Sequence, residues 1–295
     1  MSVAPVAPPV AIVTGASSGI GQACARQLAA AGLQVFGMSR TVSADLPAVA
    51  SLTVDVTDDQ AVRAGVASVL TATGRIDLLV NSAGFGLAGA VADTTIDEAR
   101  RQFEVNFFGA LRMCQAVLPG MQRQKSGLIV NVTSLGGLFG LPFQGLYSAS
   151  KFALEGLTEA LRHEAKPFGV DVVAVEPGDV RTAITRNRVR TAASAGGASA
   201  YRERFEAAMA IIERDEDKGV AAEAISERIV TIWRSPKRRP RYVCGHSSQT
   251  ISAWAKRVLP DGLFEGLIAD HYAAPSPAKP AKGSATAAGP SQGRA

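Results

Sequence analysis

The stretch VAIVTGASSGIG, residues 10–21, decides the fold of this chain. It opens with an apolar run typical of a buried strand and continues with glycines at Gly15, Gly19 and Gly21. A helical pattern follows until Gly32, which ends it. Glycines let the backbone approach an anion closely, and the free N–H groups and dipole of a helix start favour negative charge. The sequence therefore predicts a phosphate-binding turn, with tight packing of a βα turn as the alternative.

Apolar runs typical of strands alternate with longer patterns typical of helices along most of the chain. The predicted strands cover residues 10–14, 34–38, 51–54, 77–81, 128–132, 170–175 and 241–244. This alternation indicates βαβ units and a parallel sheet that is covered on both faces. We therefore expect an α/β fold: a Rossmann-type, doubly wound, seven-stranded parallel sheet in a three-layer αβα arrangement.

Length and composition favour one large domain, because the chain has 295 residues of which 47% are hydrophobic. We expect a flexible N-terminus over residues 1–9 and a single domain over residues 10–272. Residues 273–295 contain only Ala, Pro, Ser, Lys, Gly, Thr, Gln and Arg and show no periodicity. They are predicted to form a disordered tail.

Charge, cysteine and histidine patterns exclude several classes of function. The formal net charge is +5, but it accompanies no known nucleic-acid-binding module. The chain has no signal-peptide pattern and no apolar run of about 18 residues, so we expect a soluble cytoplasmic protein. The three cysteines favour reduced core thiols, and the three histidines lack metal-ligand spacing. These residues are Cys24, Cys114 and Cys244, and His163, His246 and His271.

An arginine follows the second predicted strand, which ends Met38-Ser39-Arg40. In doubly wound folds this strand end meets the adenosine ribose, where an acidic residue favours NAD and an arginine accommodates the extra phosphate of NADP. No acidic residue occurs before Asp45, and the planar guanidinium suits a phosphate. We therefore predict NADP(H) as the cofactor, with a solvated surface arginine as the alternative.

Several further motifs, in their order along the chain, resemble the single-domain branch of the short-chain dehydrogenase/reductase family. The resemblance extends from about residue 10 to about residue 272. It rests on residues 14–21, Asp55-Val56, Asn81-Ser82-Ala83-Gly84, Ser134, Tyr147-x-x-x-Lys151 and Pro177-Gly178-Asp179-Val180-Arg181-Thr182. Ser82 departs from the second asparagine usual in the family. Residues 140–143 and 147–157 are similar to the 17-beta-hydroxysteroid and retinol dehydrogenase group.

The resemblance implies an oxidoreductase, and it assigns roles to numbered residues of this chain. The implied catalytic tetrad is Asn106, Ser134, Tyr147 and Lys151. The implied cofactor contacts are Gly15, Ser17, Ser18, Gly19, Ile20, Gly21, Ser39, Arg40, Asp55, Val56, Asn81, Ala83, Gly84, Tyr147, Lys151, Pro177, Gly178, Val180 and Thr182. The implied substrate contacts are Ser134, Phe143 and Tyr147. It also implies a homodimer or homotetramer, a small carbonyl or alcohol substrate, and no metal.

The chemistry of ketone reduction explains why these residue types are needed. The hydride goes to carbon, and a proton donor must lie within hydrogen-bond reach of the oxygen. Tyr147 can serve if its pKa falls from about 10 toward neutrality, and Lys151, four residues later on the same helix face, would favour the phenolate. Ser134 would polarise the carbonyl. The backbone carbonyl of Asn106 would hold a water that links Lys151 to solvent, with a packed asparagine as the alternative.

The segment 183–217 is predicted to be a lid over the substrate, because pockets in open α/β sheets lie beyond the carboxyl ends of the strands. Gly196-Gly197 is a plausible hinge, and Phe205, Met209 and Ile212 would turn an apolar face inward. Leu141, Phe143 and Trp254 could add apolar wall, so we expect a mostly apolar substrate. Arg186, Arg188 and Arg190 are interpreted as solvated lid arginines, with recruitment of an acidic group as the alternative.

Two other functions share parts of this pattern. A sugar-nucleotide epimerase or dehydratase of the extended branch shares the Tyr-x-x-x-Lys pair, but only about 110 residues follow Thr182 here, some of them tail. A catalytically silent NADP-sensing or scaffold protein could use the same fold. The complete tetrad argues against the silent protein, and detectable turnover of any ketone would decide between an enzyme and a silent protein.

Overall fold

The computed structural model describes residues 7–42, 45–182, 188–196 and 199–273. Its centre is a parallel sheet of seven strands, in the order β11-β7-β6-β4-β1-β2-β3. The strands are β1 (Val10–Thr14), β2 (Gln34–Ser39), β3 (Val49–Thr53), β4 (Leu78–Asn81), β6 (Gly127–Val132), β7 (Val170–Pro177) and β11 (Arg241–Cys244). All seven predicted strands are confirmed, with ends that shift by at most two residues. The strand order reverses between β1 and β4, which opens a crevice at their carboxyl ends.

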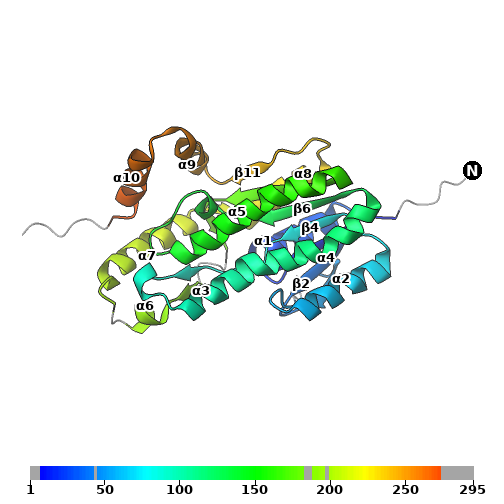
Figure 1. Ribbon diagram of the computed structural model, residues 1–295, viewed down its shortest axis with the longest axis horizontal. Coiled ribbons are helices and arrows are strands. Elements are labelled where there is room, and N and C mark those ends of the chain that lie inside the picture. The colour runs from blue at the N-terminus through cyan, green and yellow to red at the C-terminus, as the bar shows by residue number, and fades with distance from the viewer. Residues whose placement is uncertain (1–6, 43–44, 183–187, 197–198, 274–295) are drawn as a thin grey trace, which may run out of the picture.

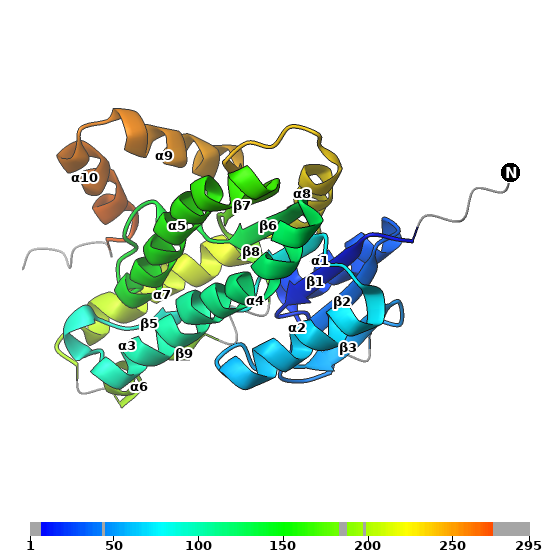
Figure 2. The same cartoon turned by 45° about the vertical axis from the view of Figure 1, so that its right-hand side comes forward.

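Helices cover both faces of this sheet, as predicted for a three-layer fold. One face carries α1 (Gly19–Ala30) and α8 (Ala222–Arg234). The other carries α2 (Asp59–Thr73), α4 (Gly109–Gln124) and α5 (Gly145–Ala165), which lie on the same side of the sheet in Figure 2. Alternate strand residues therefore enter two different cores, which explains why the strands are almost wholly apolar.

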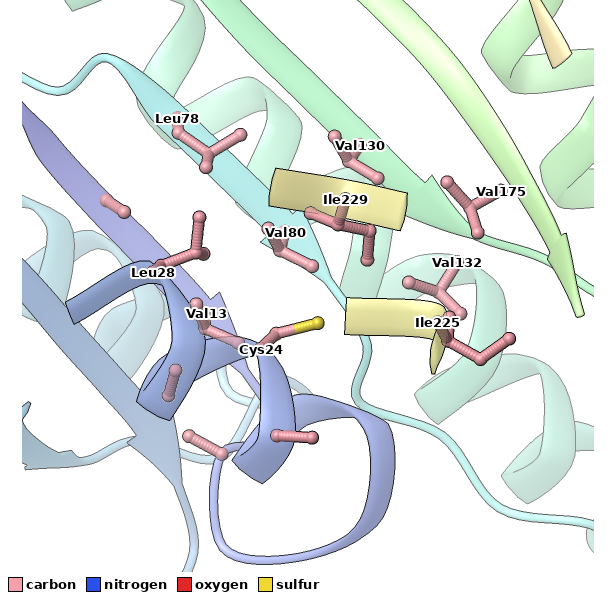
Figure 3. Close-up of a cluster of buried hydrophobic side chains, with 14 of the residues drawn as sticks. Val13, Cys24, Leu28, Leu78, Val80, Val130, Val132, Val175, Ile225 and Ile229 are labelled. Carbon is pink, nitrogen blue, oxygen red and sulfur yellow. The ribbon is translucent and has the colours of Figure 1, made fainter. Parts of the chain in front are cut away.

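Figure 3 shows the core between the sheet and the α1/α8 layer. The strand residues Val13, Val80, Val130 and Val175 lie there with Cys24 and Leu28 of α1 and with Ile225 and Ile229 of α8. The preceding strand residues Ile12, Leu79 and Ile129 enter the opposite core. The three cysteines are free and buried, which confirms their prediction as core thiols.

Short elements surround the carboxyl edge of the sheet. They are β5 (Leu87–Ala88), α3 (Ile96–Phe103), β8 (Val180–Arg181), β9 (Val189–Arg190), α6 (Ala192–Gly196), α7 (Arg202–Asp217), β10 (Val220–Ala221), α9 (Ser247–Val258) and α10 (Asp261–His271). The parallel pairs β5–β9 and β8–β10 tie the segment after β7 to this edge. Figures 1 and 2 show α9 and α10 at the end of the molecule away from α2.

Parts of three predicted segments lie outside the described residues: the flexible N-terminus up to residue 6, the lid over residues 183–187 together with Gly197, and the tail from residue 274. Within the described ranges, no helix is both long and apolar enough to cross a membrane. The same ranges contain no cluster of three or more His, Cys, Asp or Glu side chains that could hold a metal ion.

Candidate active site

A cavity of about 1560 Å³ lies at the carboxyl edge of the sheet, where the strand order reverses. Most of the residues predicted from the sequence to contact a cofactor line it. They are Gly15, Ser17, Ser18, Gly19, Ile20, Gly21, Ser39, Arg40, Asp55, Val56, Ala83, Gly84, Tyr147, Lys151, Pro177, Gly178, Val180 and Thr182, and Ser134 lies with them. Residues as far apart in the chain as Gly15 and Thr182 therefore meet in one space.

The glycine-rich turn after β1 has no room for side chains at two of its glycines. Gly15 has a φ of +67°, and a Cβ there would lie 2.9 Å from the Cα of Ala83. A Cβ on Gly21 would lie 2.3 Å from the carbonyl oxygen of Gly15. The hydroxyl of Thr14 accepts hydrogen bonds from the backbone N–H groups of Ser82 (3.0 Å) and Ala83 (3.1 Å). The turn is thus locked to the end of β4 by backbone contacts.

Arg40 and Asp55 line the cavity just after the carboxyl ends of β2 and β3. Arg40 is exposed, and in the part of the chain that the structure describes no carboxylate forms an ion pair with it. The Oδ1 atom of Asp55 accepts hydrogen bonds from the backbone N–H (2.9 Å) and the hydroxyl (2.8 Å) of Thr57. Arg40 therefore offers an uncommitted cation beside a carboxylate whose orientation is fixed.

Tyr147, Lys151 and Ser134 converge on the cavity from two elements. Tyr147 and Lys151 lie on one face of α5, and Ser134 follows β6, where its hydroxyl lies near enough to the phenol of Tyr147 to lower the pKa of that group. Gly136 permits this approach, because a Cβ there would lie 3.3 Å from the Cε1 atom of Tyr147. The ammonium of Lys151 donates to the carbonyl of Val132 at 2.9 Å and is buried.

Burial shifts the pKa of both helix residues. It lowers the pKa of Lys151 to about 8, although the carboxylate of Glu155 opposes the shift. Burial raises the pKa of Tyr147, and the nearby hydroxyl of Ser134 only partly offsets this. The pKa of Tyr147 thus lies above its ordinary value, and the fall toward neutrality expected from the sequence is wrong for the described residues. Negative charge on Glu216, which no local pattern indicated, adds to the rise.

Asn106 lies in a π-helical turn, Glu104–Phe108, between α3 and α4. Its buried side chain accepts from the backbone N–H of Phe85 at 3.0 Å and donates to the carbonyl of Phe85, also at 3.0 Å. The side chain thus matches the alternative of a packed asparagine that braces the loop after β4. A π-turn inside a helix is frequent at functional sites, and the water path from its backbone carbonyl stays a prediction.

Three side chains that were predicted from the sequence to lie at the ligand are not among the described residues that line the main cavity. The side chain of Asn81 is buried behind the cavity wall, where its amide nitrogen donates to the Oδ1 atom of Asn131 at 2.9 Å. Asn81 is therefore not one of the described residues that line the cavity. Phe143 adopts a φ of +59° and packs its ring 5.7 Å from that of Phe205, which places it under α7 instead of in the main cavity. Trp254 is 63% exposed on α9 and is not among the described residues that line the cavity.

In the described part of the predicted lid, two arginines form ion pairs with glutamates of α7. The inward apolar face of α7 is confirmed, since Phe205, Met209 and Ile212 are buried together, and Ile212 reaches the cavity. The interpretation of the arginines as solvated is wrong for Arg188, whose buried side chain pairs with Glu216. Arg190 pairs with Glu206 at 2.9 Å and Glu213 at 3.7 Å, and Arg186 lies outside the described residues.

A group of titratable side chains at the far end of the cavity was missed. Its members are Asp179, Arg188, Asp215, Glu216, His246 and His271. His271 pairs with Asp215 at 2.9 Å, and burial together with Glu216 and Asp215 raises the pKa of Asp179 to about 6. The local signals were Asp179, which lies inside the motif after β7, and Arg188, one of the three arginines of the predicted lid. The others come from α7, from the residue before α9 and from the end of α10, so no spacing in the sequence connects them.

Comparison with known proteins identifies the family. The sequence model described as short chain dehydrogenase matches residues 9–193. A 3-ketodihydrosphingosine reductase of Bacteroides thetaiotaomicron is 39% identical over 266 residues, which cover 90% of this chain and 98% of that protein. A probable short-chain type dehydrogenase/reductase of Helicobacter pylori, VdlC, is 34% identical over 265 residues, covering 88% of this chain and 96% of that protein.

Solved structures agree with this result. A short-chain dehydrogenase from Streptomyces avermitilis superposes with a TM-score of 0.74 at 31% identity, covering 90% of this chain and 94% of that chain. A short-chain dehydrogenase/reductase from Burkholderia phymatum, solved in complex with NAD, gives a TM-score of 0.70 at 28% identity, covering 84% and 92%. This chain therefore belongs to the short-chain dehydrogenase/reductase family and is an oxidoreductase with the NAD(P)-binding Rossmann fold of that family.

Proposed function

We propose that this protein is an NADP(H)-dependent reductase of a mostly apolar ketone or aldehyde, with Tyr147 as the general acid and base. The observation that carries the proposal is that Tyr147, Ser134 and Lys151 open into the same cavity as the glycine-rich turn and the Pro177-Gly178 segment. When bound, the cofactor supplies or accepts the hydride. The side chains of the protein would supply the proton and orient the carbonyl.

The proton step follows from the state of Tyr147. Because burial raises the pKa of Tyr147, the phenol is protonated at neutral pH, which is the form needed to donate to a developing alkoxide. The hydroxyl of Ser134, beside the phenol, would give the same oxygen a second hydrogen bond. The buried ammonium of Lys151 would stabilise the phenolate left after donation.

The choice of NADP(H) rests on Arg40. Its guanidinium lies at the end of β2, lines the cavity and has no ion-pair partner among the described residues. An added phosphate would find a charge-assisted donor there, and the described part of that strand end provides no carboxylate to repel it. Family membership alone does not decide the cofactor, because the Burkholderia phymatum relative was solved with NAD.

The nature of the substrate rests on the far wall and on one relative. Leu141, Phe139 and Ile212 line the cavity, as do the apolar residues Phe264, Leu267 and Ile268 of α10. The relative from Bacteroides thetaiotaomicron carries a name that states reduction of a keto compound, which supports the reductive direction here. We also propose one domain over residues 10–272 and, on the family resemblance, a homodimer or homotetramer.

The test is a cofactor-oxidation screen over neutral ketones and aldehydes and over small keto acids, run with NADPH and with NADH. We expect NADPH to be oxidised fastest with bulky neutral carbonyl compounds. A clear preference for keto acids would contradict the apolar pocket, and a preference for NADH would contradict the role of Arg40. Cofactor binding without turnover of any compound would favour the silent NADP-sensing or scaffold protein.

A further inference from the structure

We infer that Arg188 is a substrate-binding residue that donates hydrogen bonds to an uncharged oxygen, a hydroxyl or second carbonyl, on the molecule whose carbonyl is reduced. The inference rests on the proposed function and specifies the polar part of its substrate.

The backbone places Arg188 firmly at the cavity wall. Arg188 directly precedes β9, which pairs with β5, and the N–H of Val189 donates to the carbonyl of Gly86 at 2.9 Å. The side chain lies over Gly86, where a Cβ would come within 3.7 Å of the Nε atom of Arg188. The side chain is only 5% exposed, and it lines the cavity. Its position is thus set by strand pairing.

The guanidinium is held on one side and unpaired on the other. Its Nη2 atom donates to the carboxylate of Glu216. The Nε and Nη1 atoms are buried, and within the described ranges they have no hydrogen-bond partner. Buried polar groups without a partner are rare and costly, and these two donors belong to a residue that lines the cavity. A substrate oxygen would satisfy them.

The surrounding charges favour an uncharged oxygen over a carboxylate or phosphate. The charge of Arg188 is already balanced by Glu216, and Asp179 is a further acidic residue at the same end, where Asp215 pairs with His271. Glu216 and Asp215 act on Asp179 strongly enough to help raise its pKa. An anion placed here would meet this negative field, whereas a hydroxyl or carbonyl oxygen would gain hydrogen bonds at no such cost.

Arg188 and Tyr147 line the same cavity, so one substrate molecule could contact both. The charges of Arg188 and Glu216 both act on the pKa of Tyr147, in opposite directions. The wall beyond them, formed by Phe264, Leu267 and Ile268, is apolar. The inferred substrate is therefore an amphiphile, with an oxygen function near the carbonyl and an apolar remainder.

The experiment compares matched ketones and matched arginine variants. Each long-chain ketone is paired with derivatives that carry a hydroxyl one, two or three carbons from the carbonyl. Arg188→Met removes the buried donors, and Arg190→Met removes an arginine two residues away whose ion pairs lie on the surface. Arg188→Lys keeps the charge opposite Glu216 and guards against misfolding of the methionine variant.

The unaltered enzyme should prefer one hydroxyketone over its parent by roughly 10- to 100-fold in kcat/KM, as expected for hydrogen bonds to a charged group. Arg188→Met should abolish this preference, mainly through KM, and Arg188→Lys should reduce it. In Arg188→Met the loss of kcat/KM on the hydroxyketone should exceed the loss on the parent ketone by the same roughly 10- to 100-fold, and NADPH affinity should stay within about threefold of the unaltered value. Arg190→Met should retain the preference.

A preference that persists in Arg188→Met would overturn the inference. So would equal losses on parent and hydroxyketone or weaker NADPH binding, which would assign Arg188 to the fold or to the cofactor. Selective loss of keto-acid turnover would replace the uncharged oxygen by an anion. If no ketone is turned over, the proposed function fails, and calorimetric binding of the hydroxyketones to the NADP⁺ complex decides the inference: affinity at least about tenfold weaker in Arg188→Met supports it, and unchanged affinity overturns it.

Discussion

The two ends of the cavity differ in what forms their walls. At the end formed by residues 14–21, backbone atoms approach one another so closely that Gly15 and Gly21 have no space for a Cβ. At the other end, charged side chains meet: Arg188 pairs with Glu216, and His271 pairs with Asp215. One end is thus shaped by the absence of side chains and the other by ion pairs between distant segments.

This difference predicts how each end responds to substitution. An added atom at the glycine end must displace backbone, so it should disturb every ligand that binds there. A side-chain change at the charged end leaves the backbone in place, so it should alter the choice of substrate first.

Gly21→Ala should weaken NADPH and NADH alike by about 100-fold or more, because its Cβ would lie 2.3 Å from the carbonyl oxygen of Gly15 and the turn must move. Fluorescence titration with each cofactor measures the effect. Gly156→Ala on the exposed face of α5 is the control, since a Cβ there meets nothing within 4 Å. The control should keep cofactor affinity and gain about 0.5 to 1 kcal/mol of stability. Similar behaviour of the two variants would contradict the contrast.

Arg40→Asp should weaken NADPH selectively, because it removes a charge-assisted contact and adds repulsion. We expect a loss of roughly 1.5 to 3 kcal/mol for NADPH and little change for NADH. Dissociation constants for both cofactors, measured on the variant and the unaltered protein, give the result. Equal weakening of both cofactors, or a preference of the unaltered protein for NADH, would show that Arg40 does not bind the phosphate.

Ion pairs also lie behind the charged end, where Glu176 precedes the Pro177-Gly178 segment. Arg241 pairs there with Glu155 (3.0 Å), Glu159 (2.6 Å) and Glu176 (3.2 Å). Burial and the nearby charge of Glu155 raise the pKa of Glu176 from 4.5 to about 7. Between these two values the folded state binds the proton more tightly than the unfolded state. The stability that Glu176 contributes is therefore present at low pH and is lost as the pH rises through about 7.

Glu176→Gln removes this titration. Its free energy of unfolding, relative to that of the unaltered protein, should rise by about 2 to 3 kcal/mol between about pH 5 and about pH 8. Urea denaturation at the two pH values measures this difference. Glu159→Gln, which removes the exposed partner of the same arginine, should change stability by no more than about 0.5 kcal/mol. A pH-independent difference for Glu176→Gln would contradict the assigned cause.

The sheet and the end of the cavity formed by residues 14–21 were predicted from the sequence, because both depend on local patterns. Strand alternation, the three glycines and the Tyr-x-x-x-Lys spacing each lie within one or two elements. Burial of Asn81 behind the wall could not be predicted, since its partners come from β6 and α4. The charged end was also missed, because pairs such as Arg188 with Glu216 join residues that no period connects. The left-handed backbone of Phe143, which turns its ring under α7, likewise has no signature in a bulky residue.

Tyr147 lines the cavity together with residues of both ends and is the proposed proton donor. The most direct measurement is the turnover of Tyr147→Phe with a ketone that the unaltered enzyme reduces, together with its NADPH affinity and with Tyr201→Phe, an exposed tyrosine, as the control. We predict that kcat falls by a factor of about 10² to 10⁴ in Tyr147→Phe while NADPH affinity is retained, and that Tyr201→Phe behaves as the unaltered enzyme. Near-normal turnover by Tyr147→Phe would contradict the proposed mechanism.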